Sequence, residues 1–150
     1  MMWDVGVDIV DISRFRKMPY SNHRRFYDRV FTPAEVAYCS LSGNPAQHFA
    51  ATFAGKEAVY KAVSKRLNIG LRQIAILRDR SGALEVNIQV DCNEGDETRT
   101  VSPDLPSEVR VSLSHSSSYA VAFAMVRFGK LEPHIQKTRV VPLNGSFCER

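Results

Sequence analysis

The longest helical pattern in the chain extends from residue 46 to about residue 65 and lies between segments of a different periodicity. It is rich in alanine, which has the highest helix propensity, and it places large apolar side chains at helical spacing, namely Phe49, Phe53, Tyr60 and Val63. On both sides of it the sequence has the patterns of strands. One long helix between strands predicts an α+β fold in which a largely antiparallel sheet packs against that helix.

Strand patterns, alternating or continuously apolar, occur in five segments: 5–10, 74–77, 84–90, 109–114 and 119–126. The second and third flank a turn at residues 79–82 and should form a hairpin. The last two flank the serines at 116–118 and predict a second hairpin. Residues 92–107 are polar and contain prolines, so we expect a loop there.

Shorter helices are predicted between the first strand and the long helix. Residues 14–29 read as one or two helices interrupted at Pro19, and they carry six basic residues against a single acidic one, Asp28. Residues 32–35 combine an N-cap threonine, a proline at the first helical position and a glutamate at the third. This capping box predicts a helix that begins there and extends to about Leu41.

The length of 150 residues, with 44% hydrophobic and 24% charged residues, is typical of one folded domain. We assign residues 1–128 to a single compact domain and residues 129–150, which show no regular period, to a C-terminal tail of unknown role. No apolar run approaches the roughly 18 residues of a spanning helix, and the N-terminus lacks the pattern of a secretory signal. We therefore expect a cytoplasmic protein whose three cysteines, Cys39, Cys92 and Cys148, are reduced.

Two carboxylates are candidates for chemistry. Asp8 lies among aliphatic residues and must face water, a cation or a hydrogen-bond donor, because a buried unpaired charge is costly. Glu57 has Phe53 one helical turn before it and Lys61 one turn after it, which suits a half-buried carboxylate beside an ammonium. The simpler alternatives are a polar strand face that Asp8 shares with Asp4, and a solvent-exposed ion pair of Glu57 with Lys61. Spacing alone leaves them open.

His115 ends the fourth predicted strand, among the serines of residues 112–118. Hydroxyls, backbone amides and an imidazole at a strand end suit an oxyanion such as phosphate, although an exposed polar turn has the same composition. Two carboxylates from separate elements, with few nitrogen or sulfur ligands, suit a hard cation such as Mg²⁺, which binds carboxylates, waters and substrate phosphates. Together these residues predict diphosphate chemistry with magnesium.

Four segments, in order and over Val5 to Val126, resemble the holo-acyl-carrier-protein synthase family of phosphopantetheinyl transferases. They are GVDIVDISRF, RVFTPAEVAYC, FAGKEAVYKAV and VSLSHSSSYAVAFA. The resemblance implies a compact α+β subunit, commonly assembled as a trimer with active sites between neighbouring subunits. It also implies transfer of the 4'-phosphopantetheine group from coenzyme A to a serine of an apo acyl carrier protein, with release of 3',5'-adenosine bisphosphate.

The resemblance assigns roles to four residues. Asp8 and Glu57 match the metal ligands, Lys61 matches the lysine near the diphosphate, and His115 matches the histidine after the late strand. In that mechanism Mg²⁺ contacts both carboxylates and the diphosphate, and Glu57, directly or through a water, is the expected acceptor of the serine proton.

The basic segment has a matching role in such enzymes, as the docking face for the acidic recognition helix of the carrier. Arg14, Arg24 and Arg25 are the expected contacts. A solvated basic helix without a partner is the alternative.

Three departures separate this chain from its relatives. Thr52 stands where many of them carry an arginine that contacts phosphate. Residues 63–68 replace a glycine-containing loop, and Lys65 and Arg66 are expected to bind the 3'-phosphate of coenzyme A there. The tail after residue 128 is an extension.

Two other functions remain open from the sequence. The net charge of +4 and the arginine-rich helices suit a basic nucleic-acid-binding module, although that function gives no role to Asp8, Glu57 or His115. The departures also permit a degenerate homologue that binds a carrier protein without transferring to it.

Overall fold

The computed structural model describes residues 2–90, 105–129 and, by their backbone, 138–142. Its strands and helices are, in chain order, β1 (Met2–Asp11), α1 (Ile12–Lys17), η1 (Tyr20–Asn22), α2 (Arg24–Val30), α3 (Pro33–Ser40), α4 (Pro45–Val63), η2 (Leu71–Gln73), β2 (Ile74–Arg78), β3 (Leu84–Val90), β4 (Pro106–His115), β5 (Tyr119–Phe128) and β6 (Thr138–Pro142). Here η1 and η2 are short 3₁₀ helices.

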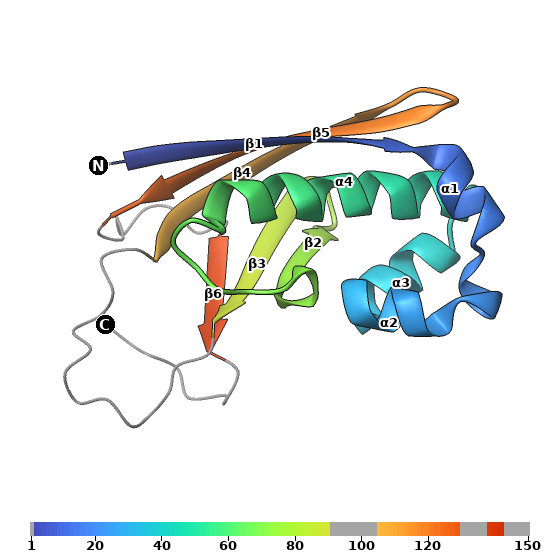
Figure 1. Ribbon diagram of the computed structural model, residues 1–150, viewed down its shortest axis with the longest axis horizontal. Helices are drawn as coiled ribbons and strands as arrows, with labels where there is room; N and C mark the ends of the chain where they lie inside the picture. Colours follow the sequence, from blue (N-terminus) through green and yellow to red (C-terminus); the bar gives the residue numbers. More distant parts are fainter. Residues whose placement is uncertain (1, 91–104, 130–137, 143–150) are drawn as a thin grey trace.

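The long helix α4 lies between two three-stranded sheets (Figure 1). The first sheet has the order β1-β5-β4 and is antiparallel throughout. The second has the order β2-β3-β6, with β2 antiparallel and β6 parallel to β3. The α+β fold, the long helix and both hairpins are therefore confirmed, whereas the sequence predicted one sheet and the structure has two.

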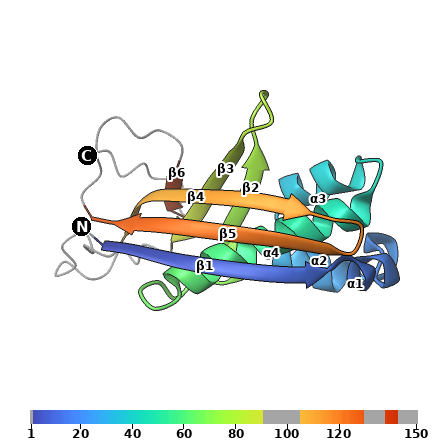
Figure 2. The same cartoon turned by 90° about the horizontal axis from the view of Figure 1, so that it is seen from above.

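The short helices gather at one end of α4, as both views show (Figures 1 and 2). The chain breaks at Pro19, as predicted, so that α1 and α2 are separate. The predicted capping box is also present: Thr32 N donates to Glu35 Oε2 at 2.7 Å, and Glu35 N donates to Thr32 Oγ1 at 3.3 Å. These bonds satisfy amides at the start of α3 that have no partner within the helix.

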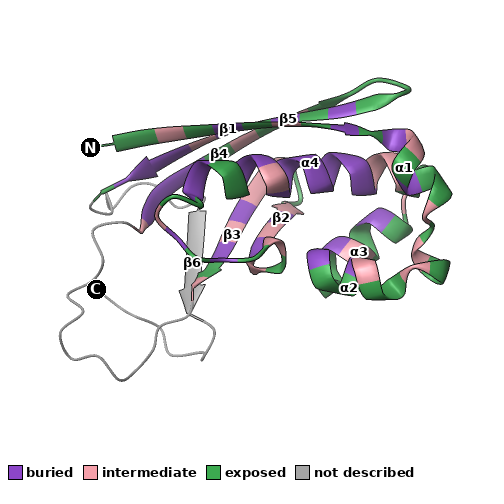
Figure 3. Ribbon diagram, viewed as in Figure 1, coloured by how far each residue is buried: buried purple, intermediate pink, exposed green. Residues whose placement is uncertain are grey.

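An aromatic cluster fixes the short helices to α4. Its members are the buried rings of Phe15, Tyr27, Phe31, Phe49 and Phe53. The centroids of Tyr27 and Phe49 lie 4.7 Å apart with a near-perpendicular arrangement, and those of Phe15 and Phe53 lie 5.7 Å apart. Such pairs add stability beyond the apolar area that they bury. In Figure 3 the buried residues accordingly follow α4 and the faces packed on it.

Gly6 brings the backbones of β1 and α4 into direct contact. A Cβ added at Gly6 would lie 1.9 Å from the carbonyl oxygen of Ala58 and 3.1 Å from the amide nitrogen of Ala62. Both obstacles are backbone atoms of a helix, which cannot rotate aside as a side chain can. Only glycine permits this separation between the strand and the helix.

Two predictions about the later part of the chain need correction. Residues 138–142, predicted to belong to an irregular tail, form strand β6 beside β3, with Val86 opposite Thr138. Its only apolar run, Val140 and Val141, is too short to predict a strand from the sequence. Pro106 and Ser107, predicted to lie in a loop, begin β4. Apart from Leu105 and Gly129, the remainder of the predicted loop and tail lies outside the described residues.

Among the helices of the described residues, none is long and apolar enough to cross a membrane. Cys39 is buried and not in a disulfide, as predicted. The other two cysteines lie outside the described residues.

Replacing Gly6 with alanine should destabilise the fold, because α4 must move away from β1 to admit the methyl group. We expect a loss of about 1–3 kcal/mol or more in the free energy of unfolding, measured by urea denaturation. Gly43→Ala is the control, because its added Cβ would meet no atom within 4 Å. Equal stability of the two variants would show that the close approach is not a constraint.

Candidate active site

Asp8 of β1 and Lys61 of α4 form an ion pair where the strand and the helix meet. Lys61 Nζ lies 2.8 Å from Asp8 Oδ1 and donates a second bond to the carbonyl oxygen of Val7 at 3.0 Å. Asp8 follows Gly6 by two residues and therefore faces α4 as Gly6 does. Its side chain is 16% exposed, whereas that of Lys61 is 50% exposed. The Asp8 carboxylate is thus largely covered, whereas the Lys61 side chain is half exposed.

Glu57 lies one helical turn before Lys61 and is half-buried. Burial raises the pKa of Glu57 above its ordinary value, and the negative charge of Asp8 raises it further. Lys61 and Arg14 act in the opposite direction, with smaller effects on the pKa. The structure therefore brings together three of the predicted residues, Asp8, Glu57 and Lys61. The pKa of Glu57 reflects a second carboxylate nearby.

This pair of carboxylates fits Mg²⁺. The two negative charges repel each other in a partly desolvated environment. A bound cation would relieve this repulsion. Among the described residues, no group of three or more His, Cys, Asp or Glu side chains could hold a metal ion. Two carboxylates would leave most coordination positions to water and substrate oxygens, which is the usual arrangement for magnesium.

His115 lies elsewhere in the same chain. Its Nδ1 is 2.8 Å from Nε2 of Gln47, in the first turn of α4, and the same Gln47 nitrogen donates to the carbonyl oxygen of Ser116 at 3.2 Å. Ten residues separate Gln47 from Glu57, which is about 15 Å along a helix. One chain therefore does not bring His115 to the two carboxylates. Gln47 was missed by the sequence analysis, because its partner is 68 residues away.

The serines after His115 form a tight turn. Ser116 N donates to the carbonyl oxygen of Tyr119 at 2.8 Å, and the Ser116 hydroxyl accepts from the amides of Ser118 and Tyr119 at 3.2 and 3.1 Å. The carbonyl of Ser117 accepts from Arg16 at 3.0 Å, which ties this turn to α1. At least one of the hydroxyls predicted to face an oxyanion is thus used within the turn.

The residues at the predicted departures have structural partners. Arg66 Nε lies 3.2 Å from Asp4 Oδ2, and its guanidinium is 4.8 Å from the ring centroid of Phe128. Lys65 is exposed beside it. Thr52 is buried, with its Oγ1 3.6 Å from Cys39 Sγ between α3 and α4. The hydroxyl at position 52 thus packs inside the fold.

The basic segment lies at the end of α4 that carries the aromatic cluster. Arg14 lies 5.3 Å from the ring centroid of Phe53, and Arg24 lies 5.6 Å from that of Tyr20. Arg14, Arg24 and Arg25 are all exposed. Since Arg14 also affects the pKa of Glu57, this basic surface adjoins the carboxylate site.

The outer face of the first sheet is apolar and exposed. Five apolar residues of β1 and β5 lie on this face, each between 39 and 66% exposed: Val5, Val7, Ile9, Val121 and Phe123. They are contiguous, because Val7 pairs with Phe123 and Ile9 with Val121. A continuous exposed apolar face of this kind is typical of an interaction surface.

Comparisons with known proteins agree on one family. The sequence profile of the 4'-phosphopantetheinyl transferase superfamily matches residues 4–124. The holo-[acyl-carrier-protein] synthase of Thermodesulfovibrio yellowstonii is 35% identical over 84% of this chain and 99% of its own length. That of Moorella thermoacetica is 40% identical over 83% of this chain and 94% of its own length.

Solved structures give the same result. The apo-ACPS structure of Chronobacterium ammoniagenes has a TM-score of 0.66 and 27% identity, and covers 86% of this chain and 99% of that chain. The ACPS–CoA complex from the same organism has a TM-score of 0.64 and 26% identity, over 87% of this chain and all of that chain.

Glu57→Gln should stabilise the metal-free protein above neutral pH. Between the ordinary and the raised pKa the folded chain holds a proton that the unfolded chain has lost, so stability falls as pH rises through that interval. Glutamine removes the charge and hence this loss. We expect a Tm higher by at most a few degrees at pH 8, since 1 kcal/mol corresponds to about 2–4 °C in a domain of this size. Calorimetry at pH 8 without divalent cations tests this, with Glu85→Gln on β3 as control. A lower Tm for Glu57→Gln would contradict the assigned environment.

Proposed function

This chain belongs to the 4'-phosphopantetheinyl transferase superfamily, and from that premise we propose that it acts as a holo-acyl-carrier-protein synthase. It transfers the 4'-phosphopantetheine group of coenzyme A to a serine of an apo acyl carrier protein and releases 3',5'-adenosine bisphosphate. The observation that carries the proposal is the meeting of Asp8, Glu57 and Lys61 where β1 packs against α4.

Asp8 and Glu57 would hold Mg²⁺ in this site. When bound, the cation neutralises charge on the diphosphate and makes its β-phosphorus more electrophilic. Glu57 takes the proton of the carrier serine, directly or through a water.

The serine oxygen forms a bond to the β-phosphorus while the bond from that phosphorus to the bridging oxygen breaks. The electron pair leaves with 3',5'-adenosine bisphosphate. Lys61, released from Asp8, compensates the negative charge that develops on the leaving phosphate.

The complete site includes His115 from a neighbouring copy of the chain. Its separation from Glu57 within one chain supports this, as does the exposed apolar face of β1 and β5, which suits burial between subunits. Assembly as a homotrimer would place these faces against one another around an axis. Lys65 and Arg66 remain predicted contacts for the 3'-phosphate.

An acidic carrier protein docks on the exposed surface of α1 and α2. Arg14, Arg24 and Arg25 supply its positive charge, and Arg14 connects that surface to Glu57. Association steered by such charges weakens as salt is added. A location in the cytoplasm remains a prediction from the sequence.

Intact-mass spectrometry of an apo acyl carrier protein tests the transfer. With coenzyme A and Mg²⁺, we expect the carrier to gain the mass of one phosphopantetheine group, and a chelator to prevent the gain. Asp8→Asn and Glu57→Gln should each lower kcat about 10²–10⁴-fold. The control is Glu85→Gln, which alters a carboxylate on β3, a strand that contributes no residue to the proposed site. If no carrier gains mass although coenzyme A binds, the chain is a degenerate homologue. Salt-dependent binding to nucleic acid without any effect of coenzyme A would favour the other alternative.

Mixed assemblies test the shared site. Asp8→Asn and His115→Ala chains should each be inactive alone, yet regain activity when they are dissociated and reassembled together. In a cyclic assembly with random mixing, about one quarter of the interfaces would combine an intact Asp8 with an intact His115. Absence of recovery in a mixture shown to contain mixed assemblies would mean that each chain builds its site alone.

A further inference from the structure

A buried ion pair lies on the side of α4 that faces the second sheet. Lys56 Nζ lies 2.6 Å from Glu35 Oε2, and both side chains are fully buried. Burial lowers the pKa of Lys56, and the charge of Glu35 raises it. Two desolvated charges contribute little net stability, since an apolar pair of similar volume is often as good. Neither residue is used by the transfer chemistry described above.

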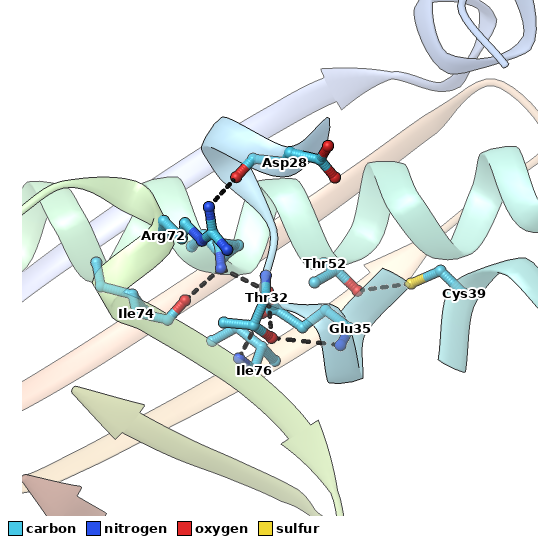
Figure 4. Close-up of polar contacts among 9 residues, drawn as sticks. Asp28, Thr32, Glu35, Cys39, Thr52, Arg72, Ile74 and Ile76 are labelled. Atoms are coloured by element: carbon cyan, nitrogen blue, oxygen red, sulfur yellow. Dashed lines mark hydrogen bonds and ion pairs between the residues drawn. The ribbon is translucent and has the colours of Figure 1, made fainter. Parts of the chain in front are cut away.

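The pair binds the edge of β2 that faces away from β3. Figure 4 shows Glu35 beside Ile74 and Ile76 of that strand. In the described part of the chain, β2 has β3 on one side only. The carbonyl of Ile74 and the amide of Ile76 point to the same side of that strand. Lys56 donates to the Ile74 carbonyl oxygen, and Glu35 Oε1 accepts from Ile76 N at 2.7 Å. The two side chains thus take the place of a neighbouring strand.

Glu35 connects this edge to α3 as well. Its Oε2 atom accepts from Thr32 N at 2.7 Å and from Lys56 Nζ at 2.6 Å, while Oε1 binds β2. One carboxylate therefore receives hydrogen bonds from the start of α3, from α4 and from the second sheet. Because these hydrogen bonds share one carboxylate, a shift of one of the three elements relative to the others would break at least one of them.

Glu57 lies between two points at which α4 is held. Lys56, one residue before it, is bound to β2, and Ala58, one residue after it, lies against Gly6 of β1. Successive residues of a helix are about 100° apart around its axis, so two contacts on different sides fix the rotation of the helix. Fixing residues 56 and 58 determines where the side chain of residue 57 points.

We infer that the Glu35–Lys56 pair positions Glu57 for metal binding and proton transfer by anchoring α4 to the edge of β2. This inference rests on the proposed function. Both are positioning residues, because their contacts lie on the far side of α4 from the carrier and coenzyme A site. An error of about 1 Å in a reacting group can lower a rate about 10²-fold, which gives this anchor a catalytic consequence.

Two double variants, in which both charged residues of the pair become uncharged, test the inference. Glu35→Gln/Lys56→Met releases α4 but leaves one acceptor oxygen, which can still bind the Ile76 amide of β2. Glu35→Met/Lys56→Met removes the hydrogen bonds to all three elements. In both we expect kcat to fall about 10–100-fold, with the KM for the carrier changed less than about threefold. Mn²⁺ binding, followed by electron paramagnetic resonance as a measurement independent of turnover, should weaken at least about tenfold.

Ile88→Ala is the control, because it removes buried volume from β3, opposite Ile74 of β2, and leaves both charged residues of the pair in place. It should lower Tm while leaving kcat and Mn²⁺ affinity within about threefold of wild type, when all variants are assayed well below their Tm. Double variants with wild-type kcat and Mn²⁺ affinity would show that the pair only holds the fold. Failure of both to fold would also overturn the positioning role. A wild-type chain that neither transfers nor binds Mn²⁺ would instead overturn the proposed function, before any variant is compared.

Discussion

The contact between Gly6 and the backbone of Ala58 is the constraint on which the rest of the structure depends. A strand and a helix are normally held apart by side chains, and removing one Cβ lets β1 approach α4 closely. This close packing determines which side chains of β1 and α4 meet on either side of the contact. Asp8, two residues after Gly6, and Lys61, three residues after Ala58, come within 2.8 Å of each other as a consequence.

The other side of α4 is held by charge instead of by close packing. Lys56 and Glu35 complete the open edge of β2 and connect it to α3. The helix is therefore fixed between two sheets by two different means, one steric and one polar. Glu57 lies between these contacts and carries a pKa raised by burial and by Asp8. A carboxylate kept close to a second one costs stability in the free protein, and a cation with a diphosphate substrate would relieve that cost.

Under the proposed function, a single chain holds only part of the active site. The carboxylates and Lys61 lie where β1 meets the second half of α4. His115 lies beside Gln47 in the first turn of that helix, which is about 15 Å along the helix axis from Glu57. The exposed apolar residues of β1 and β5 cover the outside of the same sheet. Assembly would thus bury the apolar face and complete the site together, so that catalysis and association become linked.

The sequence by itself determined the local elements and the candidate residues. The alternation around Asp8, the capping box at Thr32 and the helical spacing of Glu57 and Lys61 each depend on neighbours a few residues away, and all three elements were predicted correctly. Only the tertiary structure decided which distant groups meet. It paired Lys61 with Asp8, Gln47 with His115 and Lys56 with Glu35. It also divided the strands between two sheets, where the sequence had predicted one, and placed β6 beside β3 in the second sheet. The physical reason is that the periodicity of a sequence indicates only which face of a helix or strand is buried. Which side chains of two elements meet depends on how closely and in which register their backbones pack.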